Sequence, residues 1–200
     1  MTGFLLRYTA AALTAAAAFF VASGQHARAA DMAAAEQKAA VCAACHGDKG
    51  NSTMPAIPSI AGQPRQFIAT QLIMFRQGNR KDPQMSPMAA SLSNADINEL
   101  AAYFSAQPLA APARAADASQ SAEGKRLTDQ YNCVACHAAD LKGQQHIPRL
   151  AGQHAEYLRT QLRGFKAGTR FDMDGNMTAA AQPLSPKDVD VLADYLSSLR

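Results

Sequence analysis

The stretch CAACH at residues 42–46 decides the fold, and it returns as CVACH at residues 133–137. In both stretches two cysteines three positions apart are followed at once by a histidine. Further along, PSIAGQ at residues 58–63 returns as PRLAGQ at residues 148–153. The second copy of each stretch lies about 91 residues after the first. A shared order at a nearly constant offset indicates that the chain is a tandem duplication.

The segment between the two copies sets the expected domain boundaries. Residues 107–121 are built mainly from Pro, Ala, Ser and Gln, a composition typical of a linker. We therefore expect a first domain over residues 31–107, a linker over 108–121 and a second domain over 122–200. Each half has about 80 residues, which is small for an independent hydrophobic core. This size indicates that something besides side chains fills each interior.

Residues 1–30 have the pattern of a secretory signal peptide. Arg7 precedes an apolar run over residues 8–21, and the stretch ARA at residues 27–29 has the small-x-small pattern of a cleavage site. The apolar run is shorter than the roughly 20 residues that span a bilayer. We therefore expect a cleaved signal peptide rather than an uncleaved anchor, and a soluble, exported mature protein.

The composition excludes two classes of protein. Charged residues make up 18% of the 200 positions and hydrophobic residues 48%, which argues against a wholly disordered chain. The formal net charge of +3 is too small for a nucleic-acid binder that relies on neutralising phosphates. We therefore expect a folded protein with no nucleic-acid partner.

Helical patterns dominate both halves, and no stretch has a convincing strand pattern. One helix is expected to begin at Pro64 and to close at Gly78, because proline favours the first helical position and glycine the end. The last helix of each half starts with a serine cap and an aspartate three residues later. These pairs are Ser93 with Asp96 and Ser185 with Asp188. A further helix is expected to run into each cysteine motif, which makes the fold class all-α.

The cysteine spacing predicts covalently bound haem in each half. Two thiols three positions apart on a helical turn face the same side, so both can add to the vinyl groups of one porphyrin. The histidine that follows projects beneath the ring and can bind the iron through Nε2. The expected residues are Cys42 and Cys45 with His46 for one haem, and Cys133 and Cys136 with His137 for the other.

Three other uses of the cysteines are weaker hypotheses. Structural disulfides suit an exported protein but do not require a histidine after each pair. A thioredoxin-like redox pair needs a βαβ context, which the pattern lacks. A zinc site could use two cysteines and a histidine, yet neither half offers a clear fourth ligand at zinc-finger spacing. Two haem c groups therefore remain the predicted cofactors.

A methionine in each half is the candidate for the other axial position of the iron. Aligning the two halves backward from their last helices pairs Met85 with Met177. Methionine is a soft ligand that raises the reduction potential of haem relative to a second histidine. Met88 and Met173 lie nearby but have no methionine partner in the other half. We therefore expect Met88 and Met173 to be packing residues.

Two further repeated residue types have candidate roles beside the haem. Pro58 and Pro148 follow the histidines by 12 and 11 residues, and their carbonyl oxygens are candidate acceptors for histidine Nδ1–H. The alternative is that these prolines belong to an ordinary turn. Arg80 and Arg170 are candidates for pairing with haem propionates, with simple solvation as an equal alternative.

The chain resembles the cytochrome c4 family, which are dihaem class I cytochromes c of the bacterial periplasm. The resemblance rests on the two CxxCH motifs, the repeated AGQ segments, GNR at residues 78–80, GTR at 168–170 and the Leu-Ser entries to the last helices. It covers essentially the whole chain after residue 30. It implies two tandem all-α class I cytochrome c domains, each with one covalent haem and an iron bound by histidine and methionine.

Carried over by position, the resemblance assigns His46 and Met85 to the first iron and His137 and Met177 to the second. The second half has two more residues between its arginine and its methionine than the first half has. This difference leaves Met173 as the alternative to Met177.

The expected function follows from irons whose axial positions are both filled. No site then remains for a substrate, so we expect an electron carrier rather than an enzyme. The resemblance implies a redox donor such as a quinol-oxidising complex, an acceptor such as a terminal oxidase, and peripheral association with the membrane. The alternatives are a haem subunit of a larger dehydrogenase and a dihaem peroxidase, which would need one open iron.

Overall fold

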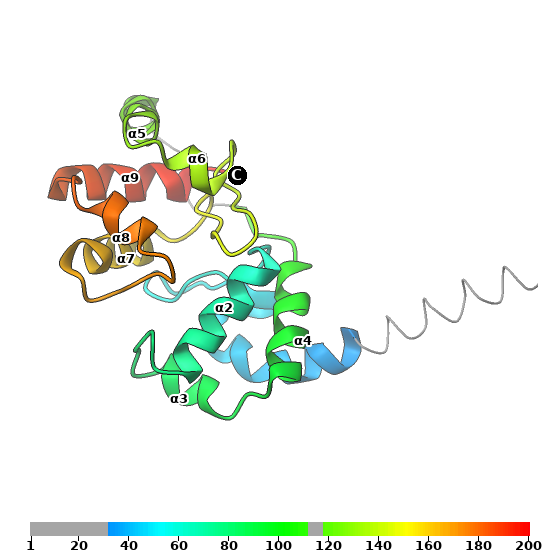
Figure 1. The fold of residues 1–200 in the computed structure, drawn as a ribbon. Coiled ribbons are helices and arrows are strands. Elements are labelled where there is room, and N and C mark those ends of the chain that lie inside the picture. The colour runs from blue at the N-terminus through cyan, green and yellow to red at the C-terminus, as the bar shows by residue number, and fades with distance from the viewer. Residues whose placement is uncertain (1–31, 112–117) are drawn as a thin grey trace, which may run out of the picture.

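The computed structural model describes residues 32–111 and 118–200, and the expected signal peptide lies outside these residues. The described chain forms two groups of helices, the first drawn from blue to green and the second from yellow-green to red (Figure 1). The first group contains a helix over residues 32–46, the 3-10 turn η1 (Asp48–Gly50), α2 (Arg65–Arg76), α3 (Met85–Ala90) and α4 (Asn94–Ser105). The second contains α5 (Ala118–Gln130), α6 (Cys133–His137), α7 (Ala155–Ala167), α8 (Asn176–Ala181) and α9 (Pro186–Ser198).

The predicted all-α fold class is confirmed. In residues 32–111 and 118–200 the β pairing is limited to an isolated bridge between Gln144 and Ile147. None of the described helices is both long and apolar enough to cross a bilayer.

Serine caps start the last helix of each half, as predicted. Ser93 Oγ accepts a hydrogen bond from Asp96 N–H at 3.1 Å, and Asp96 Oδ2 accepts one from Ser93 N–H at 3.0 Å. Ser185 and Asp188 repeat this reciprocal pair at 3.1 and 2.9 Å. Each pair satisfies backbone donors that lack an intrahelical partner. The two caps therefore fix where α4 and α9 begin.

The helix predicted after Pro64 is α2, with a boundary one residue later than expected. Pro64 is the N-cap residue, and the helix begins at Arg65. Gly78 follows the end of α2 in the left-handed conformation, with φ 74°. Gly168 ends α7 in the same way, with φ 65°. Glycine is favoured there because it has no Cβ to clash in this conformation.

Each half has its own hydrophobic core. In the first half α4 packs against α2, and in the second α9 packs against both α5 and α7. Leu100 and Phe104 of α4 are buried in the first core, and Leu127 of α5 and Val189 of α9 are buried in the second. Burying a side chain of this size contributes about 1.5–3 kcal/mol. These contacts hold the helices that position the two cysteine motifs.

Helices α5 and α9 approach each other closely at Gly124. A Cβ atom placed on Gly124 would lie 2.2 Å from Cβ of Tyr195, far inside the contact distance of two carbons. The missing side chain at this position therefore lets the first and last helices of the second half cross in contact. Their crossing supports the chain that leads into the second cysteine motif.

The helix expected to run into the second cysteine motif is interrupted, so that part of the prediction was wrong. Helix α5 ends at Gln130, and Asn132 has a left-handed φ of 52° before α6 begins at Cys133. Asparagine tolerates this conformation better than most residues. In the first half, alanine-rich sequence precedes the motif and one helix runs unbroken through residues 32–46, because alanine has the highest helix propensity.

The range expected as a linker is partly bonded and partly helical. The side chain of Asn51 donates from Nδ2 to Pro108 O at 3.0 Å, and its Oδ1 accepts from Ala110 N–H at 2.7 Å. These bonds hold the chain leaving α4 against the first half. Helix α5 begins at Ala118, inside the range 108–121 that the composition assigned to a linker.

Candidate functional site

His46 and His137 are buried, and a proline carbonyl holds each ring from behind. His46 is 6% exposed and its Nδ1 lies 2.8 Å from Pro58 O. His137 is 7% exposed and its Nδ1 lies 2.8 Å from Pro148 O. The predicted proline acceptors are thus confirmed. Because Nδ1 donates to the carbonyl, Nε2 is the ring nitrogen left to bind a metal.

The surroundings of both histidines favour the neutral imidazole. Burial lowers the pKa of His46 and of His137, and the hydrogen bond to the proline carbonyl offsets only part of this effect. Neutral imidazole is the form that binds a metal ion. Both rings are therefore neutral, with the proton on Nδ1 and with Nε2 free, which is the form that an axial ligand requires.

The four cysteines lie beside these histidines, and none of them forms a disulfide in the described residues. Cys42 and Cys133 are half-buried, whereas Cys45 and Cys136 are exposed. Burial raises the pKa of the Cys42 and Cys133 thiols. A half-buried thiol, an exposed thiol and a buried histidine on one short segment fit two thioether bonds and a proximal ligand to one haem.

Met85 and Met177 are held by the same kind of contact in the two halves. Met85 is the first residue of α3, and Met177 is the second residue of α8. The Met85 N–H donates to Asp82 Oδ1 at 2.8 Å, and the Met177 N–H donates to Asp172 Oδ2 at 2.8 Å. Both methionine side chains are half-buried. The longer loop of the second half therefore leaves the anchoring of its methionine unchanged.

Met88 and Met173 lie at the surface, so the expectation that they are packing residues was wrong. Met88 is 45% exposed and Met173 is 71% exposed. Met88 is three residues beyond Met85 on a helix of only six residues. Met173 lies in the loop before α8, between residues that are themselves exposed or half-buried. A short helix and a loop offer too little surrounding structure to cover either side chain.

Arg80 and Arg170 share hydrogen-bond acceptors across the boundary between the two halves. Arg80 Nη1 donates to Gln71 Oε1 at 2.5 Å, and its Nη2 donates to Tyr157 OH at 3.2 Å and Gln161 Oε1 at 3.1 Å. Arg170 Nη1 also donates to Gln161 Oε1. We call these five residues the arginine cluster. Its two guanidinium groups are held in place rather than freely solvated.

The arginine cluster concentrates positive charge in a partly buried place. Burial, with a contribution from the charge of Arg80, lowers the pKa of Arg170 to about 10. Burial alone would raise the pKa of Tyr157, but the two guanidinium groups outweigh it and lower that pKa. The Nε of Arg170 is buried without a hydrogen-bond partner in the described structure. An unpaired buried donor in a cationic cluster fits an anionic group such as a haem propionate.

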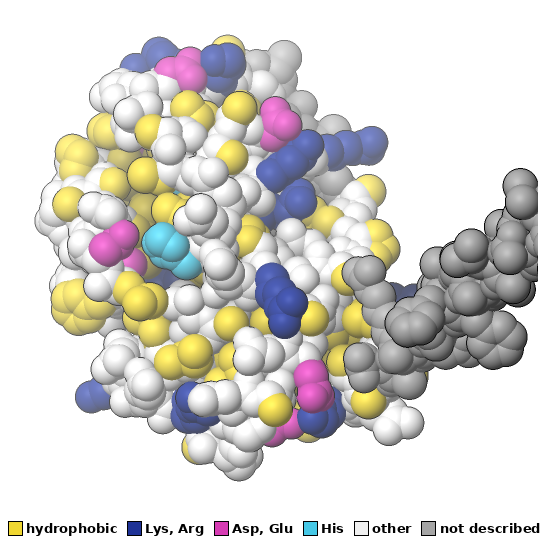
Figure 2. Space-filling view, turned by 45° about the vertical axis from the view of Figure 1, so that its right-hand side comes forward, with side chains coloured by type: hydrophobic (Ala, Val, Ile, Leu, Met, Phe, Trp, Pro, Cys, Tyr) yellow, Lys and Arg dark blue, Asp and Glu magenta, His cyan; other side chains and the backbone are white. Residues whose placement is uncertain are grey.

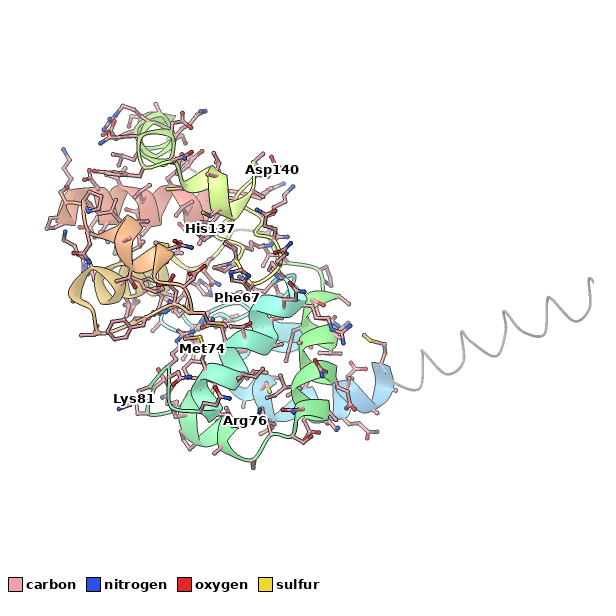
Figure 3. All side chains as sticks on the ribbon, in the orientation of Figure 1. Phe67, Met74, Arg76, Lys81, His137 and Asp140 are labelled. Atoms are coloured by element: carbon pink, nitrogen blue, oxygen red, sulfur yellow. The ribbon has the colours of Figure 1, made fainter. Side chains whose placement is uncertain are left out.

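Further hydrogen bonds join the two halves along the same boundary. The Phe67 N–H at the start of α2 donates to Gln145 O at 3.0 Å. His154 Nε2 lies 2.9 Å from Ser52 O. Figure 3 labels Phe67 and His137 near this boundary, where α2 faces the loop that follows α6. The second cysteine motif therefore lies close to the first half.

Some residues of the site were not found from the sequence. Asp82 and Asp172 each follow their arginine by two residues, and this repeated spacing could have identified them. Tyr157 differs from its first-half counterpart Phe67 by a hydroxyl group. Nothing in a single sequence indicates that this hydroxyl meets an arginine of the other half.

Comparisons with known proteins agree with this geometry. Residues 121–200 match the family described as cytochrome c, and residues 28–104 match the family described as cytochrome c oxidase, cbb3-type, subunit III. Cytochrome c4 of Pseudomonas aeruginosa is 35% identical over 181 residues, covering 84% of this chain and 89% of the relative. The thiosulfate dehydrogenase electron acceptor of Thiomonas intermedia is 35% identical over 180 residues, covering 84% and 83%. A crystal structure of reduced recombinant cytochrome c4 from Pseudomonas stutzeri is similar with a TM-score of 0.76 and 36% identity, covering 84% of this chain and 97% of that one.

A duplicated all-α fold with a CxxCH motif in each half defines the class: the chain is a dihaem class I c-type cytochrome with two covalently bound haem c groups. Within that class it belongs to the cytochrome c4 family, as the sequence predicted. Its homologues in this family are electron carriers rather than enzymes. The chain is accordingly an electron carrier, and the peroxidase alternative is not supported.

Proposed function

We propose that this chain carries electrons between proteins of a periplasmic respiratory chain through two irons, each bound by a histidine and a methionine. The observation that carries the proposal is the repeated anchoring of the candidate ligands. In each half a proline carbonyl accepts from the histidine Nδ1 and an aspartate accepts from the methionine N–H. This repetition supports His46 with Met85 for the first iron, and His137 with Met177 for the second.

The exposure of the methionines supports the same choice of distal ligands. Met177 packs against the second hydrophobic core, whereas Met173 is 71% exposed. A thioether that excludes water and other ligands from an iron needs surrounding protein to hold it in place. Met177 is held by surrounding protein in this way and Met173 is not. The exposure of Met88 argues in the same way against Met88 as the ligand of the first iron.

The residues of the chain hold and shield the cofactor. Each cysteine pair attaches one haem, and the bound group supplies an iron that accepts and releases one electron. The proximal histidine is kept in one orientation by the proline carbonyl behind it. Met85 and Met177 would be the second ligands of the two irons, which would leave exogenous molecules no coordination position. The hydrogen bonds that hold these residues would keep the ligands in place in both oxidation states, which favours electron transfer over bond chemistry.

The arginine cluster would bind haem propionates at the boundary between the two halves. Its guanidinium groups come from both halves and meet at the boundary, where their hydrogen-bond partners among the described residues are neutral. We assign the buried Nε of Arg170 to a haem propionate, which would supply the missing acceptor and negative charge. Positive charge there also favours the reduced form of a neighbouring haem.

The location follows from the N-terminal sequence and the domain limits. Residues 1–30 direct export to the periplasm and are then removed, which leaves one domain over residues 31–107 and a second whose first helix, α5, extends the expected range 122–200 back to Ala118. The two family matches, over residues 28–104 and 121–200, support these limits. Covalent attachment suits an exported protein because the cofactor cannot be lost to the surroundings.

The proposed electron acceptor is a terminal oxidase, and the proposed donor is a quinol-oxidising complex. The match of the first half to the family described as cytochrome c oxidase, cbb3-type, subunit III supports the acceptor. A dehydrogenase is the second candidate donor, because one relative of similar identity is named as an electron acceptor of thiosulfate dehydrogenase. Acidic and basic side chains are interspersed with apolar ones on the face in Figure 2, so docking there does not depend on one sign of charge.

Absorption spectra of methionine variants test the ligand assignment. Ferric haem with a methionine ligand has a weak far-red absorption band, and the wild-type protein should show it for both haems. Met85→Ala and Met177→Ala should each remove about half of the band. Met88→Ala and Met173→Ala are matched controls and should leave it unchanged. Loss of half of the band in Met173→Ala, with Met177→Ala unaffected, would reassign the second ligand.

A further inference from the structure

Two glutamines form reciprocal hydrogen-bonded bridges across the boundary between the halves. Ser59 N–H donates to Gln153 Oε1 at 2.9 Å, and Gln153 Nε2 donates to Ser59 O at 2.8 Å. In the mirrored pair, Arg149 N–H donates to Gln63 Oε1 at 2.9 Å, and Gln63 Nε2 donates to Arg149 O at 3.0 Å. Gln63 and Gln153 are the last residues of the repeated PSIAGQ and PRLAGQ stretches. Each glutamine therefore pairs with the backbone of the other half.

The peptide that each glutamine binds is also the peptide that holds a proximal histidine. The Ser59 N–H and the Pro58 carbonyl belong to one planar peptide unit, and that carbonyl accepts from His46 Nδ1 at 2.8 Å. A continuous series of hydrogen bonds thus leads from His46, through the Pro58–Ser59 peptide, to Gln153 of the other half.

The mirrored series has the same atoms in the same roles. The Arg149 N–H belongs to the peptide unit whose carbonyl, on Pro148, accepts from His137 Nδ1 at 2.8 Å. That series ends on Gln63 of the first half. The second half thereby contacts the peptide behind the first histidine, and the first half contacts the peptide behind the second.

The bridging glutamines are buried and their orientation is fixed. Gln63 is 4% exposed and Gln153 is 5% exposed. If the side-chain amide of either glutamine were reversed, its NH₂ would face the backbone N–H and its oxygen would face the backbone carbonyl. Only one orientation therefore pairs both amide groups of the glutamine with both backbone groups. Buried hydrogen bonds of this kind polarise one another more strongly than exposed ones. Each amide oxygen is therefore held against a peptide N–H of the other half, and that of Gln153 also accepts from the His154 N–H at 3.0 Å, a backbone bond that His154→Ala keeps.

We propose that Gln153 and Gln63 are positioning residues that set the reduction potential of the haem in the opposite half. An acceptor on the Ser59 N–H shifts electron density toward the Pro58 oxygen, which strengthens the hydrogen bond from His46 Nδ1. A stronger bond at Nδ1 makes Nε2 a better donor to iron and so favours the ferric state. Removing Gln153 raises the potential of the first haem, and removing Gln63 raises that of the second. This inference rests on the proposed assignment of both histidines as proximal ligands.

Redox titration of the full dihaem protein with Gln153→Met and Gln63→Met tests the inference. Methionine matches glutamine in length but presents no amide. The potential of each haem is followed by NMR of its bound methionine, identified with Met85→Ala and Met177→Ala. Gln153→Met should change the reduction equilibrium of the first haem about threefold in favour of the reduced form, about 28 mV. The shift of the second haem should be smaller, and Gln63→Met should give the opposite distribution.

His154→Ala is the matched control. It also removes a hydrogen bond across the boundary, but from Ser52 O, which is not part of the peptide behind His46. It should leave the difference between the two potentials unchanged. If Gln153→Met does not fold, Gln153→Asn keeps an amide one methylene too short to bridge and should raise the first potential in the same way.

Three results would overturn the inference. The shift could fall on the haem of the substituted half, it could be equal for both haems, or it could match the shift in His154→Ala. In each case the glutamines would only fasten the halves together. Failure of the histidine assignment itself is seen separately, because NMR of the wild-type protein would then lack the signals of an imidazole bound to each iron.

Discussion

Replacing Asp172 with alanine should release the loop that presents Met177. The Asp172 carboxylate accepts from Met177 N–H at 2.8 Å, from Thr178 N–H at 3.1 Å and from Thr178 Oγ1 at 2.8 Å. These bonds outweigh the effect of burial and hold the pKa of Asp172 below its ordinary value. The carboxylate is thus ionised at neutral pH and fixes the first turn of α8. Its loss removes three hydrogen bonds from the segment that holds the distal ligand.

The size of the effect follows from the number and kind of these bonds. A hydrogen bond to a charged group contributes about 1.5–3 kcal/mol, but the three share one partly exposed carboxylate and water replaces some of them. We therefore expect a net loss of about 2 kcal/mol in the local stability of this loop. That loss corresponds to a roughly 30-fold increase in the fraction of molecules with Met177 detached.

The assay is cyanide binding to the ferric protein, since cyanide enters only after the methionine has left. Asp172→Ala should increase the affinity of the second haem about 30-fold and leave the first haem unchanged. Asp174→Ala is the matched control, because its carboxylate lies in the same loop but accepts from Asn176 and faces His146 at 3.8 Å, rather than accepting from Met177 or Thr178. Equal effects of the two substitutions, or an effect confined to the first haem, would refute the reasoning.

Three further predictions concern stability, pH and charge. Gly124→Ala places a methyl group against Tyr195 and should lower the free energy of unfolding by about 1–3 kcal/mol in denaturant titrations, and no loss would mean that the helices can separate freely. Hydrogen bonds from the backbone N–H and the side chain of Ser185 lower the pKa of Asp188. The carboxylate therefore stabilises the fold above about pH 4, and this contribution is lost as the pH falls through the lowered pKa. Asp188→Ala should therefore have a lower free energy of unfolding than the wild type at neutral pH, and this free energy should fall less steeply in acid. The same acid dependence in both proteins would contradict the prediction. Arg170→Gln removes a positive charge from the arginine cluster and should lower the reduction potentials in a redox titration, and a rise would contradict the propionate assignment.

The features that the sequence predicted correctly depend on residues close together in the chain. Cys-x-x-Cys-His fits one helical turn, and Ser93 and Asp96 cap a helix with atoms only three residues apart. The duplication added a second, independent copy of each signal. The duplication also aligned Met85 with Met177, although the loops before them differ in length. In the structure the backbone N–H of each methionine donates to an aspartate of its own loop.

The features that escaped prediction depend on contacts between distant residues. The break at Asn132 was missed because no proline or glycine marks it in the sequence, whereas the backbone of Asn132 is left-handed. The exposure of Met88 and Met173 depends on which elements cover them, and single-residue hydrophobicity does not record this. The AGQ repeat is visible in the sequence. Only the folded structure shows that Gln63 and Gln153 each bind the peptide behind the histidine of the other half.

Carbon monoxide titration of the reduced holoprotein, with binding expressed per haem, tests most directly whether both irons are closed by protein ligands. The account predicts two haems per chain and no spectral change on adding carbon monoxide, because His46 with Met85 and His137 with Met177 fill both axial positions. Stoichiometric binding of carbon monoxide at either iron, or fewer than two haems per chain, would contradict it.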